Sequence, residues 1–317
     1  MSSDYIPRLR GELLRAAAEG KARRRVGPVL RPVAAVAALA LVVAALVIVL
    51  PGASDVERPA DRGDTVRLEY RVPPADCAET ARILQERLAT AGIRPAEVTA
   101  TDDGRVTVTV PAAERAAVAP LLQTGHLALY DWEGSVLGPD GTPAPTDTDV
   151  TGGIDPVYSG SISESEAKAR VSGRSDAVAV ALADQPKRWF ALGGASAITN
   201  AQLSGARAAV DPMVKEPIVT LSLTAAGQNA FRELTRTIAR RGADNAGSNA
   251  DPLASSHHFA IVIDDRIIAI PYINWRENPD GIDGANGTQI AGGLTPETAQ
   301  ALAAVLSSGP LPAPLTR

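Results

Sequence analysis

The residues of this chain that could do chemistry stand in predicted loops and turns. His257 and His258 are adjacent and could bind a metal ion or act in acid–base catalysis. Adjacent side chains point apart on a strand, however, and no HExxH motif or carboxylate at ligand spacing accompanies them. We therefore interpret them as loop or strand-entry residues. Asp264 and Asp265 could form a pair of acids, but their place between two apolar runs indicates a turn.

Other sequence patterns associated with catalysis are incomplete. Residues 193–196 (GGAS) lack the GxSxG pattern of a nucleophile elbow, and the glycines in 284–293 lack the strand–loop–helix context of a phosphate-binding loop. Cys77 is the single cysteine, so the chain cannot form an internal disulfide. We predict no catalytic, cofactor-binding or metal-binding residue, and a metal-dependent enzyme is the least favoured functional class.

One apolar run predicts a membrane anchor. Residues 33–50 read VAAVAALALVVAALVIVL, which is 18 uncharged residues and, with Val29 and Leu30, just long enough to cross a hydrocarbon layer of about 30 Å. Nothing comparable recurs, so we predict a single-pass protein that contacts the lipid bilayer through 33–50. A cleaved secretory signal, releasing 54–317, is the alternative. Pro51 makes its cleavage pattern poor, and the 32-residue leader is long.

The charges beside this run predict its orientation. Residues 1–32 carry eight basic and three acidic side chains, which predicts a cytoplasmic tail. The chain beyond the span has 23 basic and 33 acidic residues, so we expect residues 51–317 to be extracytoplasmic. A nucleic-acid partner is disfavoured, because it would require a concentrated basic face.

The periodicity of residues 64–132 predicts a ferredoxin-like unit of order β-α-β-β-α-β. Alternating apolar residues mark strands around 66–72, 98 and 106–110, with a turn at 102–104, and we predict that the chain returns as a last strand over 126–132. Helices are expected over 77–91, with Asp76 as N-cap, and over about 113–123. Residues 133–175 contain GPDGTPAPTDTDVTGG and are predicted to be a linker and a weakly defined region.

The second half, 176–309, predicts mixed helices and strands, followed by a tail over 310–317. We expect strands over 177–183, 188–192 and from 217, a hairpin with arms 259–263 and 267–270, and helices near 201–210, from Thr224 to about 241 and from Thr295 to Gly309. The loop over 242–257 is polar.

Three segments resemble a known family. VTLSLTAAGQNAFRELT, HHFAIVIDDRIIAIPYIN and QIAGGLTPETAQALAAVLSSGPLPAPL are similar, in this order, to the extracytoplasmic head of SecD and SecDF, the accessory subunits of the bacterial Sec translocase. ITNAQLSGARAAV resembles the entry to that head, and VRLEY, ARILQERLATAGI and GRVTVTVP resemble the base subdomain of the same family. The resemblance implies an α+β fold: a ferredoxin-like base plus an α+β head, preceded by a single transmembrane helix.

The resemblance also limits the expected activity. Family members continue into five further membrane helices with ionisable residues, whereas this sequence ends at Arg317 and its one predicted span has no ionisable residue. We therefore expect no proton-driven motor of its own. The expected partners are exported polypeptides or components of the Sec translocase.

Tyr272, Asn274 and Trp275, in IPYINWRENPDG, are the candidate contact residues for a polypeptide or partner, because aromatic residues beside a loop are good contact anchors. The alternative is that Tyr272 closes the core and Trp275 covers it. A further functional class stays open: a single-span sensor or scaffold, in which the basic, amphipathic N-terminal tail binds a cytoplasmic partner.

Overall fold

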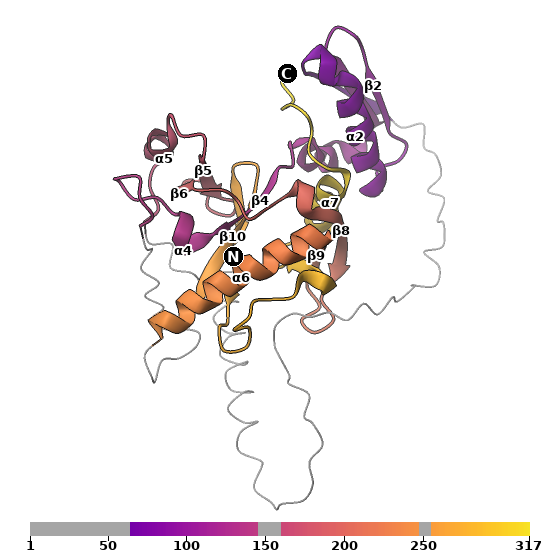
Figure 1. Cartoon of the computed structure of the whole chain (residues 1–317). Coiled ribbons are helices and arrows are strands. Elements are labelled where there is room, and N and C mark those ends of the chain that lie inside the picture. Colours follow the sequence, from indigo (N-terminus) through magenta and orange to yellow (C-terminus); the bar gives the residue numbers. More distant parts are fainter. Residues whose placement is uncertain (1–63, 145–159, 247–254) are drawn as a thin grey trace, which may run out of the picture. The chain divides into compact units, whose positions relative to one another are not determined.

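The computed structural model describes residues 64–144, 160–246 and 255–317. The predicted span at 33–50 and cytoplasmic tail at 1–32 lie outside these residues, as does half of the predicted 242–257 loop, residues 247–254. Within the described part, no helix combines the length and apolar character that a membrane crossing requires. The architecture is α+β, as predicted from the sequence (Figure 1).

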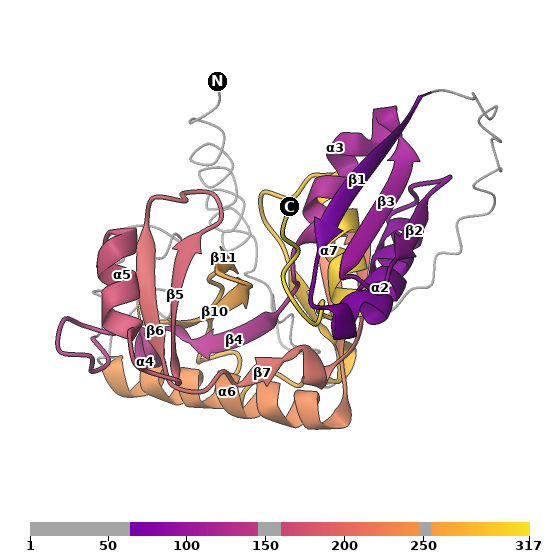
Figure 2. The ribbon, with the colours of Figure 1, turned by 90° about the horizontal axis from the view of Figure 1, so that it is seen from above.

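The base subdomain begins with a three-stranded antiparallel sheet covered by one long helix. The sheet order is β1-β3-β2, with Leu68 opposite Val108 and Val98 opposite the same residue on the other side. Its elements are β1 (Thr65–Arg71), η2 (Pro74–Asp76), α2 (Cys77–Thr90), β2 (Glu97–Ala100) and β3 (Arg105–Pro111). Figure 2 shows β1, β3 and β2 side by side with α2 next to them.

The helix predicted over 113–123 is divided into three short helical segments. These are η3 (Ala112–Glu114), α3 (Arg115–Val118) and η4 (Ala119–Leu122). Pro120 lacks a backbone N–H and cannot continue a regular α-helix, which explains the change to 3-10 geometry. Val118 and Leu121 nevertheless fill the base core, at 1% and 0% exposure.

The last predicted strand of the base exists but lies in a different sheet. The base sheet therefore has three strands, and the prediction that 126–132 completes a β-α-β-β-α-β unit is wrong. β4 (Leu127–Asp131) pairs with β10 (His257–Ile263) on one side and with β7 (Ile198–Thr199) on the other. At the free edge of β1, Arg71 instead exchanges backbone hydrogen bonds of 2.7 and 3.0 Å with Thr316. Leu311, at 0% exposure, belongs to the same core as α2.

The head subdomain contains two sheets. The larger has the order β6-β5-β11-β10-β4-β7, with β12 also paired to β10. The smaller has the order β13-β9-β8. The remaining strands are β5 (Ala177–Leu182), β6 (Trp189–Gly193), β8 (Leu203–Val210), β9 (Pro217–Leu223), β11 (Arg266–Ala269), β12 (Tyr272–Ile273) and β13 (Thr288–Ile290).

Four helices and two 3-10 turns accompany these sheets. They are α4 (Trp132–Ser135), α5 (Glu164–Val171), η5 (Asn200–Gln202), α6 (Ala225–Asn245), η6 (Gly284–Asn286) and α7 (Pro296–Ser308). Thr224 caps α6, and Thr295 caps α7 with Pro296 in its first turn, as predicted. Figure 2 shows α6 running beneath β4 and β7. Phe231, Leu234 and Ile238 of α6 pack in a core with Phe259 and Ile261 of β10.

Two predictions for this half need correction. Residues 203–210 form a strand, not a helix, because Ala206 to Val210 pair one by one with β9 and the sheet outweighs the helix propensity of the alanines. Residues 136–138, predicted to lie in a solvated linker, are buried, with Leu137 donating to Ala191 O at 2.8 Å. The predicted strands at β5, β6, β10 and β11 are confirmed.

Candidate functional site

The loop that follows β12 lies against α6; one hydrogen bond forms within the loop and another joins it to the helix. The Asn278 amide donates to Asn274 O at 2.9 Å, and the Ile282 amide donates to Thr235 Oγ1 of α6 at 2.8 Å. Gly281 has φ +82°, and a Cβ there would come within 2.3 Å of Arg232 O. Only glycine fits this close approach, so the loop can lie directly on the helix.

Trp275 occupies the space between this loop and α6. Its indole Nε1 donates to Ser255 Oγ at 2.8 Å, and its ring packs against the head core. Gly242 leaves room for the ring, because a Cβ at that position would lie 2.9 Å from Trp275 Cδ1. The Arg276 guanidinium lies over the indole, 4.9 Å from the ring centroid, in a cation–π contact.

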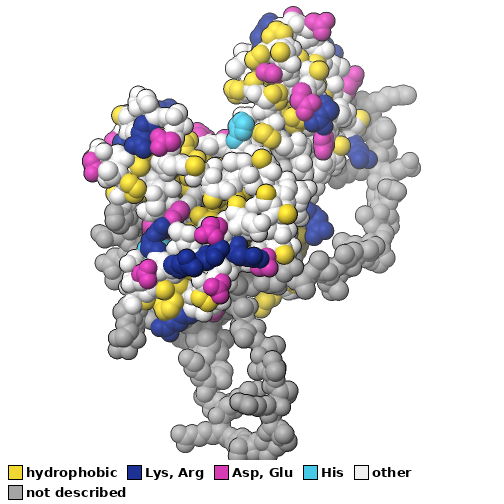
Figure 3. Space-filling view, viewed as in Figure 1, with side chains coloured by type: hydrophobic (Ala, Val, Ile, Leu, Met, Phe, Trp, Pro, Cys, Tyr) yellow, Lys and Arg dark blue, Asp and Glu magenta, His cyan; other side chains and the backbone are white. Residues whose placement is uncertain are grey.

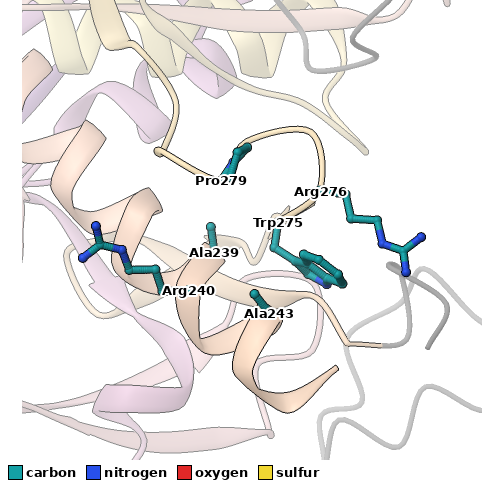
Figure 4. A pocket seen from close by; sticks show the side chains of 6 residues that line it. All are labelled: Ala239, Arg240, Ala243, Trp275, Arg276 and Pro279. Carbon is teal, nitrogen blue, oxygen red and sulfur yellow. The ribbon is translucent and has the colours of Figure 1, made fainter. Parts of the chain in front are cut away.

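A pocket of about 410 Å³ opens beside this indole. Figure 4 shows the ring between α6 and the loop, with Arg240 and Arg276 pointing outward on opposite sides of it. The lining is therefore apolar at its base and carries a guanidinium at two places on its rim. The lining residues are Ala239, Arg240, Ala243, Trp275, Arg276 and Pro279.

Of the three predicted contact residues, Trp275 alone lines this pocket. Asn274 shapes the loop: its Oδ1 accepts a hydrogen bond from the Arg276 amide at 3.1 Å. Tyr272 lies on β12 opposite His258 and is 37% exposed, so it does not close the core. Its neighbour Ile273, at 1% exposure, fills that place.

The adjacent histidines, interpreted as strand-entry residues, begin β10, but both lie close to one carboxylate that the sequence analysis did not connect with them. Glu133 of α4 accepts from the His258 amide at 2.9 Å, and its Oε1 lies 2.7 Å from His258 Nδ1. The other oxygen lies 3.7 Å from His257 Nδ1. His257 Nε2 in turn lies 3.0 Å from the Asn245 side-chain amide at the end of α6.

The Glu133 carboxylate is stabilised in its charged form although it is buried. Burial by itself would raise the pKa of Glu133, but the His257 and His258 rings and the His258 amide more than offset this and lower the pKa to about 2. Arg241 of α6 contributes a weaker contact at 3.9 Å and forms a two-pronged ion pair with Asp131. The cluster thus joins α4, β4, β10 and the C-terminal end of α6.

Among the described residues, no group of His, Cys, Asp or Glu side chains has the geometry to hold a metal ion. Glu133 lies 125 residues from His258, and no local motif signals the contact. In the sequence, the only sign of a role for Glu133 is its position directly after the predicted strand over 126–132.

The turn predicted at Asp264–Asp265 is confirmed, and it has a structural role. Asp264 adopts φ +56°, and its carboxylate accepts from the Gly125 and His126 amides at 2.9 Å each. These are the residues just before β4, so the hairpin holds the segment that leads from the base into the head sheet. The free thiol of Cys77 is buried in the base core.

Residues 175–313 match the family model described as the SecDF P1 head subdomain. This part of the chain is similar to a SecDF P1 head subdomain. The resemblance of this part of the chain to the extracytoplasmic region of the SecD/SecDF family is therefore confirmed. The pocket beside Trp275 and the two histidines that contact Glu133 lie within these matched residues.

Two curated relatives are protein translocase subunits SecD. The chain is 34% identical to SecD of Acetobacter pasteurianus over 119 residues, which cover 38% of this chain and 19% of the relative. It is 34% identical to SecD of Streptomyces coelicolor over 89 residues, 28% of this chain and 15% of that relative. The chain thus spans less than a fifth of the length of these relatives.

Two solved structures of SecDF are also similar. One is a crystal structure of SecDF in a super-membrane-facing form, with TM-score 0.48 and 24% identity, covering 80% of this chain and 29% of that chain. The other comes from work on the structure and function of SecDF as a membrane component that enhances protein export. It has a TM-score of 0.46 and 23% identity, and the match covers 79% of this chain and 97% of that chain.

Proposed function

We propose that this chain is an accessory component of Sec-dependent protein export and that its P1 head binds a segment of the translocating polypeptide beside Trp275. The match of residues 175–313 to the SecDF P1 head is the observation that carries this proposal. An anchor at 33–50, with residues 1–32 in the cytoplasm and 51–317 outside, would place the head where exported chains emerge. Protease treatment of spheroplasts should then digest 51–317 and spare 1–32.

The pocket supports polypeptide binding for a physical reason. Its apolar base can receive one side chain of an extended segment, and a partly buried indole is a rigid anchor that loses little entropy on binding. A binding surface of this kind needs no catalytic group, and we propose an accessory protein, not an enzyme.

The first test compares two aromatic residues that are three positions apart. Trp275→Ala should weaken binding of an unfolded model polypeptide at least tenfold, because it removes the wall of the pocket, whereas Tyr272→Ala should leave binding unchanged. Fluorescence anisotropy with a labelled, permanently unfolded polypeptide measures both. Ala243→Gln, on an exposed helical position, blocks the pocket without removing core packing and should weaken binding as well.

The second test asks what reaches the pocket in cells. A photocrosslinker at Ala243 should capture a stalled export intermediate, and a photocrosslinker at Glu79, exposed on α2 of the base, should not. Equal capture at both positions, or capture at neither, would contradict the proposed site.

A further inference from the structure

Three arginines follow one face of α6 at four-residue spacing. Arg232, Arg236 and Arg240 are separated by about one helical turn each, so their side chains lie on the same side of the helix. Figure 3 shows Lys and Arg side chains gathered in a row across the middle of the head in this view. The last of the three arginines, Arg240, lines the pocket.

The first two arginines form ion pairs with acidic residues of the chain itself. Arg232 Nη2 lies 2.9 Å from Asp283 Oδ1, and Arg236 pairs with Glu233 one turn earlier. Arg240 differs: it is exposed, and nowhere in 64–144, 160–246 or 255–317 does a carboxylate or hydrogen-bond acceptor pair with its guanidinium. The guanidinium at the pocket rim is therefore available to a ligand.

The pocket and this guanidinium together define a ligand chemistry. A guanidinium binds a carboxylate through two parallel hydrogen bonds, and consecutive residues of an extended chain are about 3.3 Å apart. An apolar side chain in the pocket would thus bring the adjacent residues of the same segment to the rim. Arg276, held over the indole, adds a second positive charge on the other side.

We infer that the Trp275 pocket selects extended polypeptide segments in which an apolar residue is flanked by an acidic one. This inference rests on the proposed function and adds the class of segment that is bound. The preference must be local, because the chain carries a net charge of −5, and its general field favours basic ligands. The two effects predict opposite orders of affinity, so the experiment can separate them.

The test uses three labelled unfolded peptides of identical length with one central Phe, flanked on both sides by Glu, Gln or Lys. We expect the Glu peptide to bind about five- to tenfold more tightly than the Gln peptide, and the Lys peptide to bind most weakly. Arg240→Gln should abolish the difference, and Arg240→Glu should reverse it in favour of the Lys peptide. Arg232→Gln is the matched control, since its guanidinium already pairs with Asp283, and the order should stay unchanged.

The outcomes separate this inference from the proposed function. Binding that Trp275→Ala abolishes but that is equal for all three peptides would leave the proposed function standing and overturn the acidic preference. Tightest binding of the Lys peptide to the unmodified chain would also overturn it. Failure of every peptide to bind would overturn the proposed function itself.

Discussion

Glu133 shows how one buried side chain can depend on residues far away in the sequence. Its carboxylate is 7% exposed as a residue and is held by the backbone and ring of His258. A buried charge is tolerated only when such partners compensate for the loss of water. The fold must therefore bring α4 and β10 together for Glu133 to be buried in its ionised form.

We predict that Glu133→Gln lowers the free energy of unfolding by about 3 kcal/mol at pH 7, because one pKa unit corresponds to about 1.4 kcal/mol. The pKa of Glu133 falls from its ordinary value of 4.5 to about 2 on folding, so its contribution is fully present above pH 4.5 and is lost as the pH falls towards 2. Urea unfolding at pH 7, 4 and 3 measures the difference from the unmodified chain, which should shrink with acid.

Asp265→Asn provides the control for this change. It is the same carboxyl-to-amide replacement on an exposed turn, and it should alter the unfolding free energy by less than about 0.5 kcal/mol. A difference for Glu133→Gln that does not change with pH would contradict the assigned ionisation.

At the scale of elements, β4 was predicted correctly as a strand, but its place in the head sheet was not. Its alternating Leu127 and Leu129 predicted a strand with two buried residues, which is confirmed at 2% and 1% exposure. Its partner could not be read from the same pattern, because alternation reports which face is buried and not which strand lies beside it. Hydrogen bonds from the Gly125 and His126 amides to Asp264 hold its start.

We predict an order of stability for variants of Asp264: unmodified, then Asn, then Gly, then Ala. Asn keeps one acceptor oxygen for these amides and tolerates φ +56°. Gly tolerates this φ but has no side-chain acceptor, and Ala has no acceptor and does not tolerate this φ. The loss for Ala should reach about 2–4 kcal/mol, combining unsatisfied amides with backbone strain. Chemical denaturation of the four proteins gives the order, and a Gly variant as stable as the unmodified chain would show that the carboxylate contributes nothing.

At the scale of the molecule, the two ends of the described chain build one core. Ala301, Ala304 and Val305 of α7 pack with Leu84 and Leu88 of α2, more than 200 residues earlier. Arg87, at 0% exposure, lies in this contact and donates to Leu121 O, Thr124 O and Gly309 O at 2.8, 2.9 and 2.8 Å. Burial lowers its pKa to about 10, and the charge of Asp264 opposes this shift.

We predict that Arg87→Lys lowers the free energy of unfolding by about 3 kcal/mol or more, because a lysine cannot reproduce the guanidinium fork and leaves buried carbonyl groups without donors. Arg82→Lys is the matched control on the same helix. Arg82 forms solvent-exposed ion pairs with Glu79 and Glu86, so this change should leave the free energy of unfolding nearly unchanged. Equal stability of the two variants would show that the Arg87 contacts do not hold the base to α7.

The sequence determined most of the individual elements, since periodicity, caps and turns act over a few residues. Thr295 and Pro296 defined the start of α7, the Asp264–Asp265 turn defined the hairpin, and three ordered segments indicated the SecD/SecDF family. It also gave Trp275, with Tyr272 and Asn274, as a candidate contact residue, although not the pocket beside it.

Only the tertiary structure decided which distant residues meet. The lining of the pocket combines α6 with a loop more than 30 residues later, and Glu133 reaches His258 across 125 residues. β4 joined the head sheet, and the 311–316 segment took a place beside the base. Local sequence patterns do not predict these contacts, because pairing and packing between distant segments depend on the free energy of the whole fold.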